Sequence, residues 1–142
     1  MKREILFRGK RSDNGEWIYG YLIGNNVIVG EVVDFDEEYF TTEFWYKVNP
    51  ETVGMFTGLT DKNGTKIFEG GIIKVPSRGR LYVVIWSTWV HDEKRNKYLT
   101  DRYEFTGWCI SKNGINPCDT LDIEILQGEV IGSVHDNSGI LK

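Results

Sequence analysis

The chain has 142 residues, a formal net charge of −4 and 13% aromatic residues, and it contains no alanine and only one glutamine. Val, Ile, Thr and the aromatic residues are plentiful while two good helix formers are nearly missing, which predicts a mostly β protein. The acidic balance argues against non-specific nucleic-acid binding, which depends on neutralising phosphates with Lys and Arg. The length suits one well-buried core or two small ones packed together.

Signals for export and for disulfide bonding are weak in this sequence. Residues 1–11 hold no apolar run typical of a signal peptide, and the longest apolar runs have only the length of a strand. Two cysteines, Cys109 and Cys118, are too few for a disulfide framework, so we expect reduced structural thiols that are buried or half-buried. We therefore expect a cytoplasmic protein that does not attach to a membrane.

Residues 1–60 are predicted to form an N-terminal β subdomain. Strands are expected at residues 2–7 and 39–48, and the turn Gly24-Asn25-Asn26 predicts a hairpin between strands 17–23 and 27–33. The acidic run DFDEE at residues 34–38 is interpreted as a solvated loop. A divalent-cation site is the alternative, but the run lacks the glycine and the distant glutamate of an EF-hand.

The stretch 52–75 is the most turn-rich part of the chain. In Asp61-Lys62-Asn63-Gly64, Asn63 and Gly64 are predicted to occupy the two central positions of a type I′ turn. A second turn is predicted at Glu69-Gly70-Gly71, where both glycines are free to adopt a positive φ. We interpret the stretch as a structural corner between two sheets, and an exposed ligand-binding loop is the alternative.

Residues 61–142 are predicted to form a C-terminal, barrel-like subdomain that packs on the first as one compact unit. Strands at 72–75 and 81–86 resemble, in pattern only, the start of an SH3-like barrel. The charged run 91–101 predicts a long loop or a short exposed helix. Further expectations are strands at 103–111, 121–125 and 129–134, a loop at 115–120, and Ile140-Leu141 packed back onto the body. About ten short strands in two small packed sheets or barrels are expected in all.

Recognisable catalytic motifs do not occur in the chain. It has no Gly-x-Ser-x-Gly elbow, no P-loop and no dinucleotide-binding loop, and its two histidines and two cysteines lack the spacing of zinc ligands. We therefore expect no enzymatic activity, no cofactor and no metal.

Basic and aromatic residues do gather in the second half of the chain. Single-stranded nucleic acid can bind such a surface by stacking its bases beside a basic groove. The candidate residues are Arg78, Arg80, Trp89, Lys94, Arg95, Lys97 and Arg102. We expect instead that the aromatic residues of this region fill the core of a chain that has no alanine, while the charges are solvated, and the nucleic-acid surface is the alternative. These aromatic residues are Trp86, Trp89, Tyr98, Tyr103 and Trp108.

Three motifs in the chain resemble one known family. Residues 52–74 follow the pattern TVG-x-[FY]-TGL-x-DKNG-x-x-I-[FY]-EG-x-I-[IV]-K, and the opening Arg3–Arg8 and the closing Glu129–Asn137 are also similar to the YopX family of phage and prophage proteins. The resemblance implies phage or prophage origin and a bacterial cytoplasm, and it implies no particular activity. Gly71 departs from the family pattern, which usually has Asp there, so a chemical role of that Asp would be missing here.

Three hypotheses for function follow, in order of preference. The first is a non-enzymatic interaction module that binds an unknown protein of host or phage, with self-association favoured by the exposed strand edges of small sheets. The second is a single-stranded nucleic-acid-binding module that uses the surface of residues 78–108. The third is an enzyme of unrecognised type, which would need a pocket where groups with shifted pKa values converge.

Overall fold

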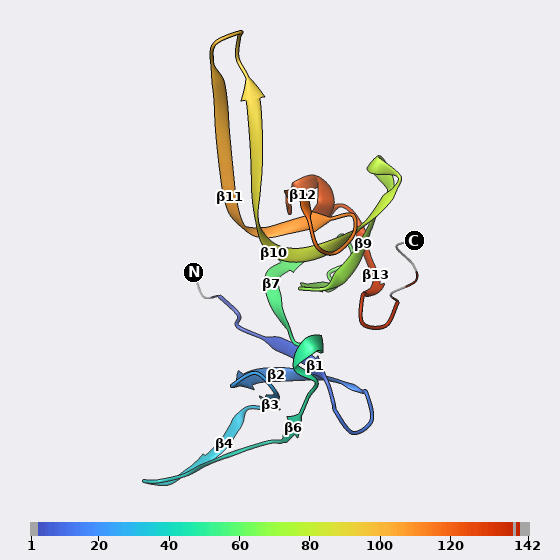
Figure 1. Cartoon of the computed structure of the whole chain (residues 1–142). Coiled ribbons are helices and arrows are strands. Elements are labelled where there is room, and N and C mark those ends of the chain that lie inside the picture. Colours follow the sequence, from blue (N-terminus) through green and yellow to red (C-terminus); the bar gives the residue numbers. More distant parts are fainter. Residues whose placement is uncertain (1–2, 138, 140–142) are drawn as a thin grey trace. The chain divides into compact units, whose positions relative to one another are not determined.

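The computed structural model describes residues 3–137 and 139, and its strands form three antiparallel sheets (Figure 1). The mostly β prediction is confirmed, and no sheet within the described residues closes into a barrel. The chain divides into two compact units, Met1–Gly58 and Leu59–Lys142. The expected packing of Ile140 and Leu141 lies outside the described residues. Among the described residues, no helix is both long and apolar enough to cross a membrane.

The main sheet of the first unit has the strand order β6-β3-β2-β1-β7. The predicted hairpin is confirmed as β2 and β3, with Tyr21 opposite Val29 and Ile23 opposite Val27. Its second strand ends at Val29 and not at residue 33, and the Phe44 ring packs against the next residue, Gly30, where a Cβ would lie 2.7 Å from it. The bounds are β1 (Phe7–Lys10), β2 (Trp17–Ile23), β3 (Val27–Val29), β6 (Trp45–Lys47) and β7 (Gly54–Thr60), with the 3₁₀ turn η1 (Pro50–Thr52) before β7.

A separate two-stranded hairpin interrupts this sheet between β3 and β6. It consists of β4 (Val32–Phe35) and β5 (Phe40–Thr42), and nearly all of its residues are exposed. The single strand predicted at 39–48 is therefore wrong, since β5 and β6 belong to different sheets. The DFDEE run forms the end of β4 and the following turn, where Asp36 accepts from the backbone N–H groups of Glu38 and Tyr39 at 2.8 and 2.7 Å.

The second unit contains a five-stranded sheet with the order β12-β11-β10-β9-β13. Its core consists mainly of aliphatic side chains, so the expectation that aromatic residues would supply the core volume is wrong. The buried residues of the core cluster are Ile67, Ile73, Val75, Tyr82, Val84, Ile110 and Ile125. The bounds are β8 (Lys66–Phe68), β9 (Gly71–Val75), η2 (Pro76–Arg78), β10 (Arg80–Lys94), β11 (Thr100–Ser111), β12 (Pro117–Thr120), α1 (Ile123–Leu126) and β13 (Glu129–Ser133).

Two local predictions for this unit are wrong. The apolar–acidic alternation at 121–125 predicted a strand, but residues 123–126 form the short helix α1 because the Asp122 side chain accepts from the backbone N–H of Ile125 at 3.2 Å and caps the turn. The run 91–101 predicted a loop or helix, but β10 continues to Lys94 and β11 begins at Thr100. In addition, part of the loop expected at 115–120 pairs with β11 as β12.

Candidate functional site

The corner stretch is held together by one buried carboxylate. Asp61 is only 6% exposed, and its Oδ1 accepts from the backbone N–H groups of Asn63 and Thr65 at 2.8 and 2.9 Å. Its Oδ2 accepts from the backbone N–H of Val130, 69 residues away, at 2.8 Å. Burial opposes ionisation here, but the three backbone hydrogen bonds outweigh it and lower the pKa of Asp61. Oδ1 thus holds the turn itself together, and Oδ2 fastens the turn to β13.

The glycines of the corner behave differently from the prediction. Gly64 has φ +81°, but no described residue other than glycine has a positive φ, so the type I′ turn predicted at Asn63-Gly64 is wrong. The Asp61 carboxylate closes a different turn, in which the N–H of Gly64 donates to the Asp61 carbonyl at 3.1 Å. Of the second pair, Gly70 has φ +83° while Gly71 lies outside the left-handed region.

Gly71, the departure from the family pattern, lies at a close backbone approach. A Cβ at this position would lie 2.9 Å from the Phe68 carbonyl oxygen. Glu69 and Gly70 form the turn before it, and the N–H of Gly70 donates to the Val84 carbonyl at 2.8 Å. The second turn of the corner is therefore also tied to the sheet by its backbone.

A two-stranded ribbon of β10 and β11 projects from the sheet of the second unit (Figure 1). β10 and β11 pair continuously from Val83–Ser111 to Lys94–Thr100. Their outer neighbours stop much earlier, since β9 pairs with β10 only up to Val83 and β12 pairs with β11 only from Cys109. We call residues 87–107 the arm. Within the described residues both outer edges of the arm lack a neighbouring strand.

One face of the arm carries a row of aromatic rings. Trp89 lies opposite Phe105 and His91 lies opposite Tyr103, so the four side chains share a face. The Trp89 and His91 rings stack with centroids 5.3 Å apart, and His91 and Tyr103 are 6.5 Å apart. Tyr103 and Phe105 remain 51% and 41% exposed. We call these four residues the aromatic face.

A glycine makes room at the base of the aromatic face. The Phe105 ring lies over Gly107, where a Cβ would approach its Cζ to 2.8 Å. On the other face of the ribbon, Trp86 and Trp108 make an edge-to-face contact with centroids 5.0 Å apart. Trp108 also packs against the core, so the base of the arm is anchored in the unit while the arm itself is solvated.

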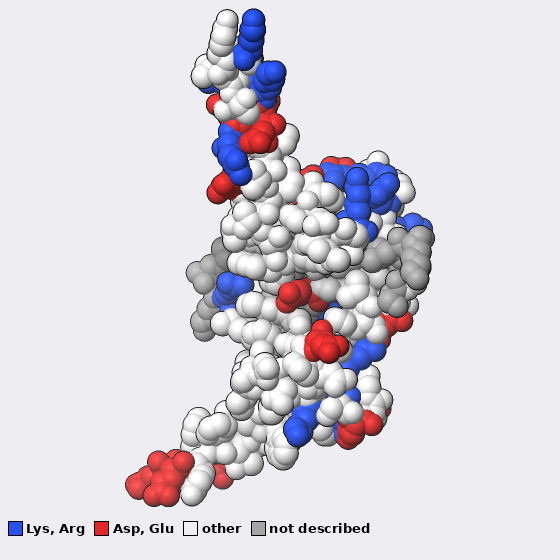
Figure 2. All heavy atoms as spheres, in the orientation of Figure 1, with Lys and Arg blue, Asp and Glu red and all other residues white. Residues whose placement is uncertain are grey.

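The arm carries charges of both signs in equal number. It contains four basic residues, Lys94, Arg95, Lys97 and Arg102, and four acidic residues, Asp92, Glu93, Asp101 and Glu104. Arg95 pairs with Asp101 at 3.1 Å and Arg102 with Glu104 at 3.4 Å. Figure 2 shows the Lys and Arg side chains mixed with Asp and Glu along this projection. The arm therefore has no net charge.

The seven residues predicted as a nucleic-acid surface fall into two groups. Arg78 lies in η2, where its guanidinium binds Glu124 at 2.9 Å and Asp119 at 3.3 Å. Arg80 begins β10, whose other end is Lys94. A strand rises about 3.3 Å per residue, so these two positions can be up to about 46 Å apart. The structure thus places Trp89 and Arg102 on opposite faces of the arm and Lys94, Arg95 and Lys97 at its end, and it leaves Arg78 and Arg80 at the sheet.

The pair of Arg78 and Glu124 fastens α1 to η2. Arg78 and the Ser77 hydroxyl both donate to the Glu124 carboxylate and lower its pKa. Because this arginine is occupied by two carboxylates, it is engaged in the fold. A shallow pocket of about 420 Å³ lies next to η2. Its lining includes Pro76, Gly79, Arg80, Leu81 and Ile131.

The two cysteines are buried to the degree that was predicted. Cys109 and Cys118 are both free thiols, the first buried and the second half-buried. Burial raises the pKa of the Cys109 thiol, which disfavours the reactive thiolate. No group of three or more His, Cys, Asp or Glu side chains placed to hold a metal ion occurs in the described residues.

A signal for the aromatic face is present in the sequence. Trp89 and His91 are two residues apart, and so are Tyr103 and Phe105, which is the spacing of side chains on one face of a strand. The prediction of a loop at 91–101 hid this pattern, because it separated the two pairs.

Comparison with known proteins agrees with the motif resemblance. No curated protein matches the chain. A family model described as YopX protein matches residues 6–142, which is nearly the whole chain. The resemblance noted at residues 52–74 and at both ends is thereby confirmed, and the chain belongs to the YopX family.

Proposed function

We propose that this chain is a phage or prophage accessory protein of the bacterial cytoplasm, and that it acts as a non-enzymatic interaction module. The arm is its contact surface for a protein of host or phage. The aromatic face carries this proposal, because its rings stack on a projecting ribbon outside the core cluster of the unit, and Tyr103 and Phe105 remain exposed. Trp, Tyr and Phe are enriched at protein interfaces and among the residues that dominate binding energy.

The edges of the ribbon support the same proposal. In the described residues, the outer edges of residues 87–94 and 100–107 have no neighbouring strand. An exposed edge can accept an extended segment of a partner as an additional strand, whose backbone supplies affinity while side-chain contacts supply specificity. The arm thus offers both modes of recognition along one element.

Binding of single-stranded nucleic acid is the second candidate. The stacked rings of Trp89, His91 and Tyr103 favour it, since bases stack readily on such platforms. The equal numbers of acidic and basic side chains on the arm disfavour it, because a basic groove normally follows the phosphates.

Enzymatic activity ranks third. Two of the carboxylates with shifted pKa values, Asp61 and Glu124, are engaged in the turn and in the pair with Arg78. These groups stabilise the fold and do not converge on a pocket of the kind that an active site requires.

A capture experiment with matched variants tests the proposal. Tagged wild type, the double variant Trp89→Ala/Tyr103→Ala, and the control Thr88→Ala/Val90→Ala from the other face are incubated with lysate of a phage-carrying bacterium, with and without nuclease. We expect wild type and control to retain a stoichiometric protein that resists nuclease, and the aromatic-face variant to lose it. Equal capture by all three proteins would refute the arm as the contact surface. Nucleic acid that is eluted by high salt would favour the second candidate.

A further inference from the structure

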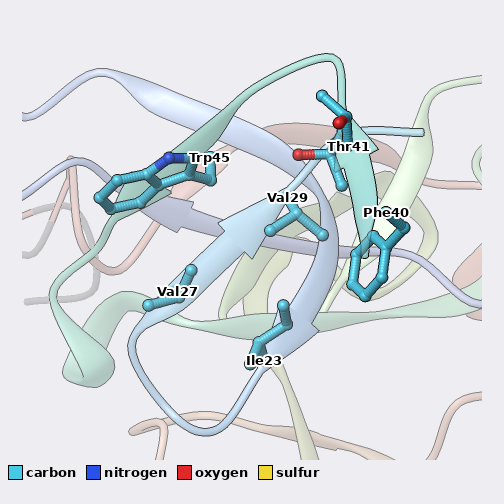
Figure 3. A pocket seen from close by; sticks show the side chains of 7 residues that line it. Ile23, Val27, Val29, Phe40, Thr41 and Trp45 are labelled. Atoms are coloured by element: carbon cyan, nitrogen blue, oxygen red, sulfur yellow. The ribbon is translucent and has the colours of Figure 1, made fainter. Parts of the chain in front are cut away.

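The first unit carries an apolar groove beside the β4–β5 hairpin. It has a volume of about 460 Å³ and is lined by Ile23, Val27, Val29, Phe40, Thr41, Thr42 and Trp45. Figure 3 shows Phe40 and Trp45 on either side of Val29, with Ile23 and Val27 nearby. Trp45 is 65% exposed, and Phe40 and Ile23 are more than half exposed. A groove of this size fits one or two large side chains.

The groove lies beside a strongly acidic segment. Residues 31–43 contain six acidic residues and no Lys or Arg: Glu31, Asp34, Asp36, Glu37, Glu38 and Glu43. Three of them form the hairpin turn that leads directly into Phe40, which lines the groove. Figure 2 shows the acidic cluster at the end of this hairpin. An occupant of the groove should therefore combine apolar side chains with positive charge.

The end of the arm has this combination. Residues 94–99, which we call the tip, read Lys-Arg-Asn-Lys-Tyr-Leu and contain three basic residues and no acidic one. Tyr98 is 83% exposed and Leu99 is 54% exposed. The tip has a defined shape, because the Asn96 side chain accepts from the N–H groups of Tyr98 and Leu99 at 2.8 and 3.1 Å and the N–H of Arg95 donates to the Leu99 carbonyl at 3.0 Å.

We propose that the tip of one copy of the chain docks into the groove of a second copy. Tyr98 and Leu99 enter the apolar groove, while Lys94 and Lys97 face the carboxylates of Asp36, Glu37 and Glu38. Opposite charges steer the two surfaces together and fix their orientation. Because the tip and the groove are different surfaces, the contact either closes reciprocally in a two-fold dimer or repeats head to tail in rings or open chains.

This inference goes beyond the proposed function, since it uses the tip and not the aromatic face, and it names the partner. Each can fail without the other. A variant of the aromatic face should still self-associate, and a variant of the tip should still capture the protein that the aromatic face binds.

Sedimentation velocity with charge-swapped variants tests the contact. The tip variant is Lys94→Glu/Lys97→Glu and the groove variant is Glu37→Lys/Glu38→Lys. The control Lys74→Glu/Lys112→Glu makes the same charge change at two exposed residues away from the tip. All are compared over a range of protein concentrations at low and at high salt, with circular dichroism as the check of folding.

We expect wild type and control to associate as concentration rises and to dissociate at high salt, because exposed charges are screened within about 10 Å at 0.1 M salt. Each charge-swapped variant alone should associate at least about tenfold more weakly, which corresponds to about 1.4 kcal/mol. An equimolar mixture of the two should associate again, since each tip then meets a groove of opposite charge. The variant Tyr98→Ser should weaken association without changing its salt dependence.

Three results would overturn the inference. The first is a wild-type protein that stays monomeric at every concentration. The second is association that the tip and groove variants leave unchanged. The third is a mixture of the two variants that associates no better than either alone, which would show that the two charged surfaces do not meet.

Discussion

The corner around Asp61 and the arm both belong to the second unit and are both rich in polar residues, but they use them differently. At the corner, a buried carboxylate accepts three backbone hydrogen bonds, and one of them reaches Val130. On the arm, polar side chains pair across the ribbon surface and leave the backbone edges in solvent. The turn motif that follows the family pattern therefore serves the fold, and the charged run that was predicted as a loop belongs to the candidate contact surface.

Removal of the Asp61 carboxylate is expected to give the largest loss of stability, and it tests whether the corner stabilises the fold. In Asp61→Ala the N–H groups of Asn63, Thr65 and Val130 lose their acceptor. A buried donor without a partner costs about 1–3 kcal/mol, so we expect a loss of about 3 kcal/mol in the free energy of unfolding, measured by urea denaturation.

Asp36 is the matched control. Its side chain also accepts hydrogen bonds from two backbone N–H groups of a turn. That turn is exposed, and both donors lie within three residues of Asp36. Asp36→Ala should cost less than about 1 kcal/mol, because water can replace the lost acceptor. Equal losses for the two variants would contradict the central role of the buried carboxylate.

A substitution that strains the backbone of the corner turn is expected to give the next largest loss of stability. Gly64 has φ +81°, which a β-branched residue adopts only with strain, while Asn63 does not have a positive φ. We expect Gly64→Val to cost about 2 kcal/mol and Asn63→Val much less, as measured by thermal unfolding. A type I′ turn would instead make both substitutions costly, so comparable losses would restore the turn predicted from the sequence.

The parts of the fold that sequence analysis predicted correctly have short-range signals. Strands β2 and β3 flank a recognisable turn, and the strand predicted at 72–75 ends at Val75 as expected, where η2 begins with Pro76. The errors come from contacts that a local pattern does not contain. The cap provided by Asp122 accompanies a helix where alternation predicted a strand, and the strand predicted to reach residue 33 divides into β3 and β4, which belong to different sheets.

The arm was missed for a different reason. A strand is usually recognised because one face is buried and the other is wet, but residues 91–101 are solvated on both faces of a ribbon. The same misassignment separated Trp89 and His91 from Tyr103 and Phe105, although their spacing is visible in the sequence. Only the register of β10 with β11 shows that the four rings share one face.

The pH dependence of stability tests whether the charge of Asp61 stabilises the corner. Burial opposes ionisation of Asp61, but the hydrogen bonds from Val130, Thr65 and Asn63 outweigh it and lower its pKa. The carboxylate therefore stabilises the fold above the ordinary pKa of Asp, about 3.9, and this contribution is lost as the pH falls through the lower pKa of the folded state.

The measurement is urea denaturation of wild type and Asp61→Asn from pH 7 down to pH 3. Other carboxylates are present in both proteins, so their contributions cancel in the difference between the two. We expect that difference to be largest near neutral pH and to shrink on acidification. A difference that stays constant with pH would mean that the charge of Asp61 does not stabilise the corner.

The smallest expected change in the free energy of unfolding is for a substitution on the arm. It tests whether the rings of the aromatic face contribute to folding. Trp89 contacts other rings of the aromatic face, and the core cluster of the unit does not include it. Trp89→Ala should therefore change the free energy of unfolding by less than about 1 kcal/mol, whereas truncating a buried aromatic residue costs about 3–5 kcal/mol. A loss as large as that of Asp61→Ala would mean that the aromatic face belongs to the stable body of the unit. A small loss, together with loss of partner capture by Trp89→Ala/Tyr103→Ala, would show that these rings serve binding and not folding.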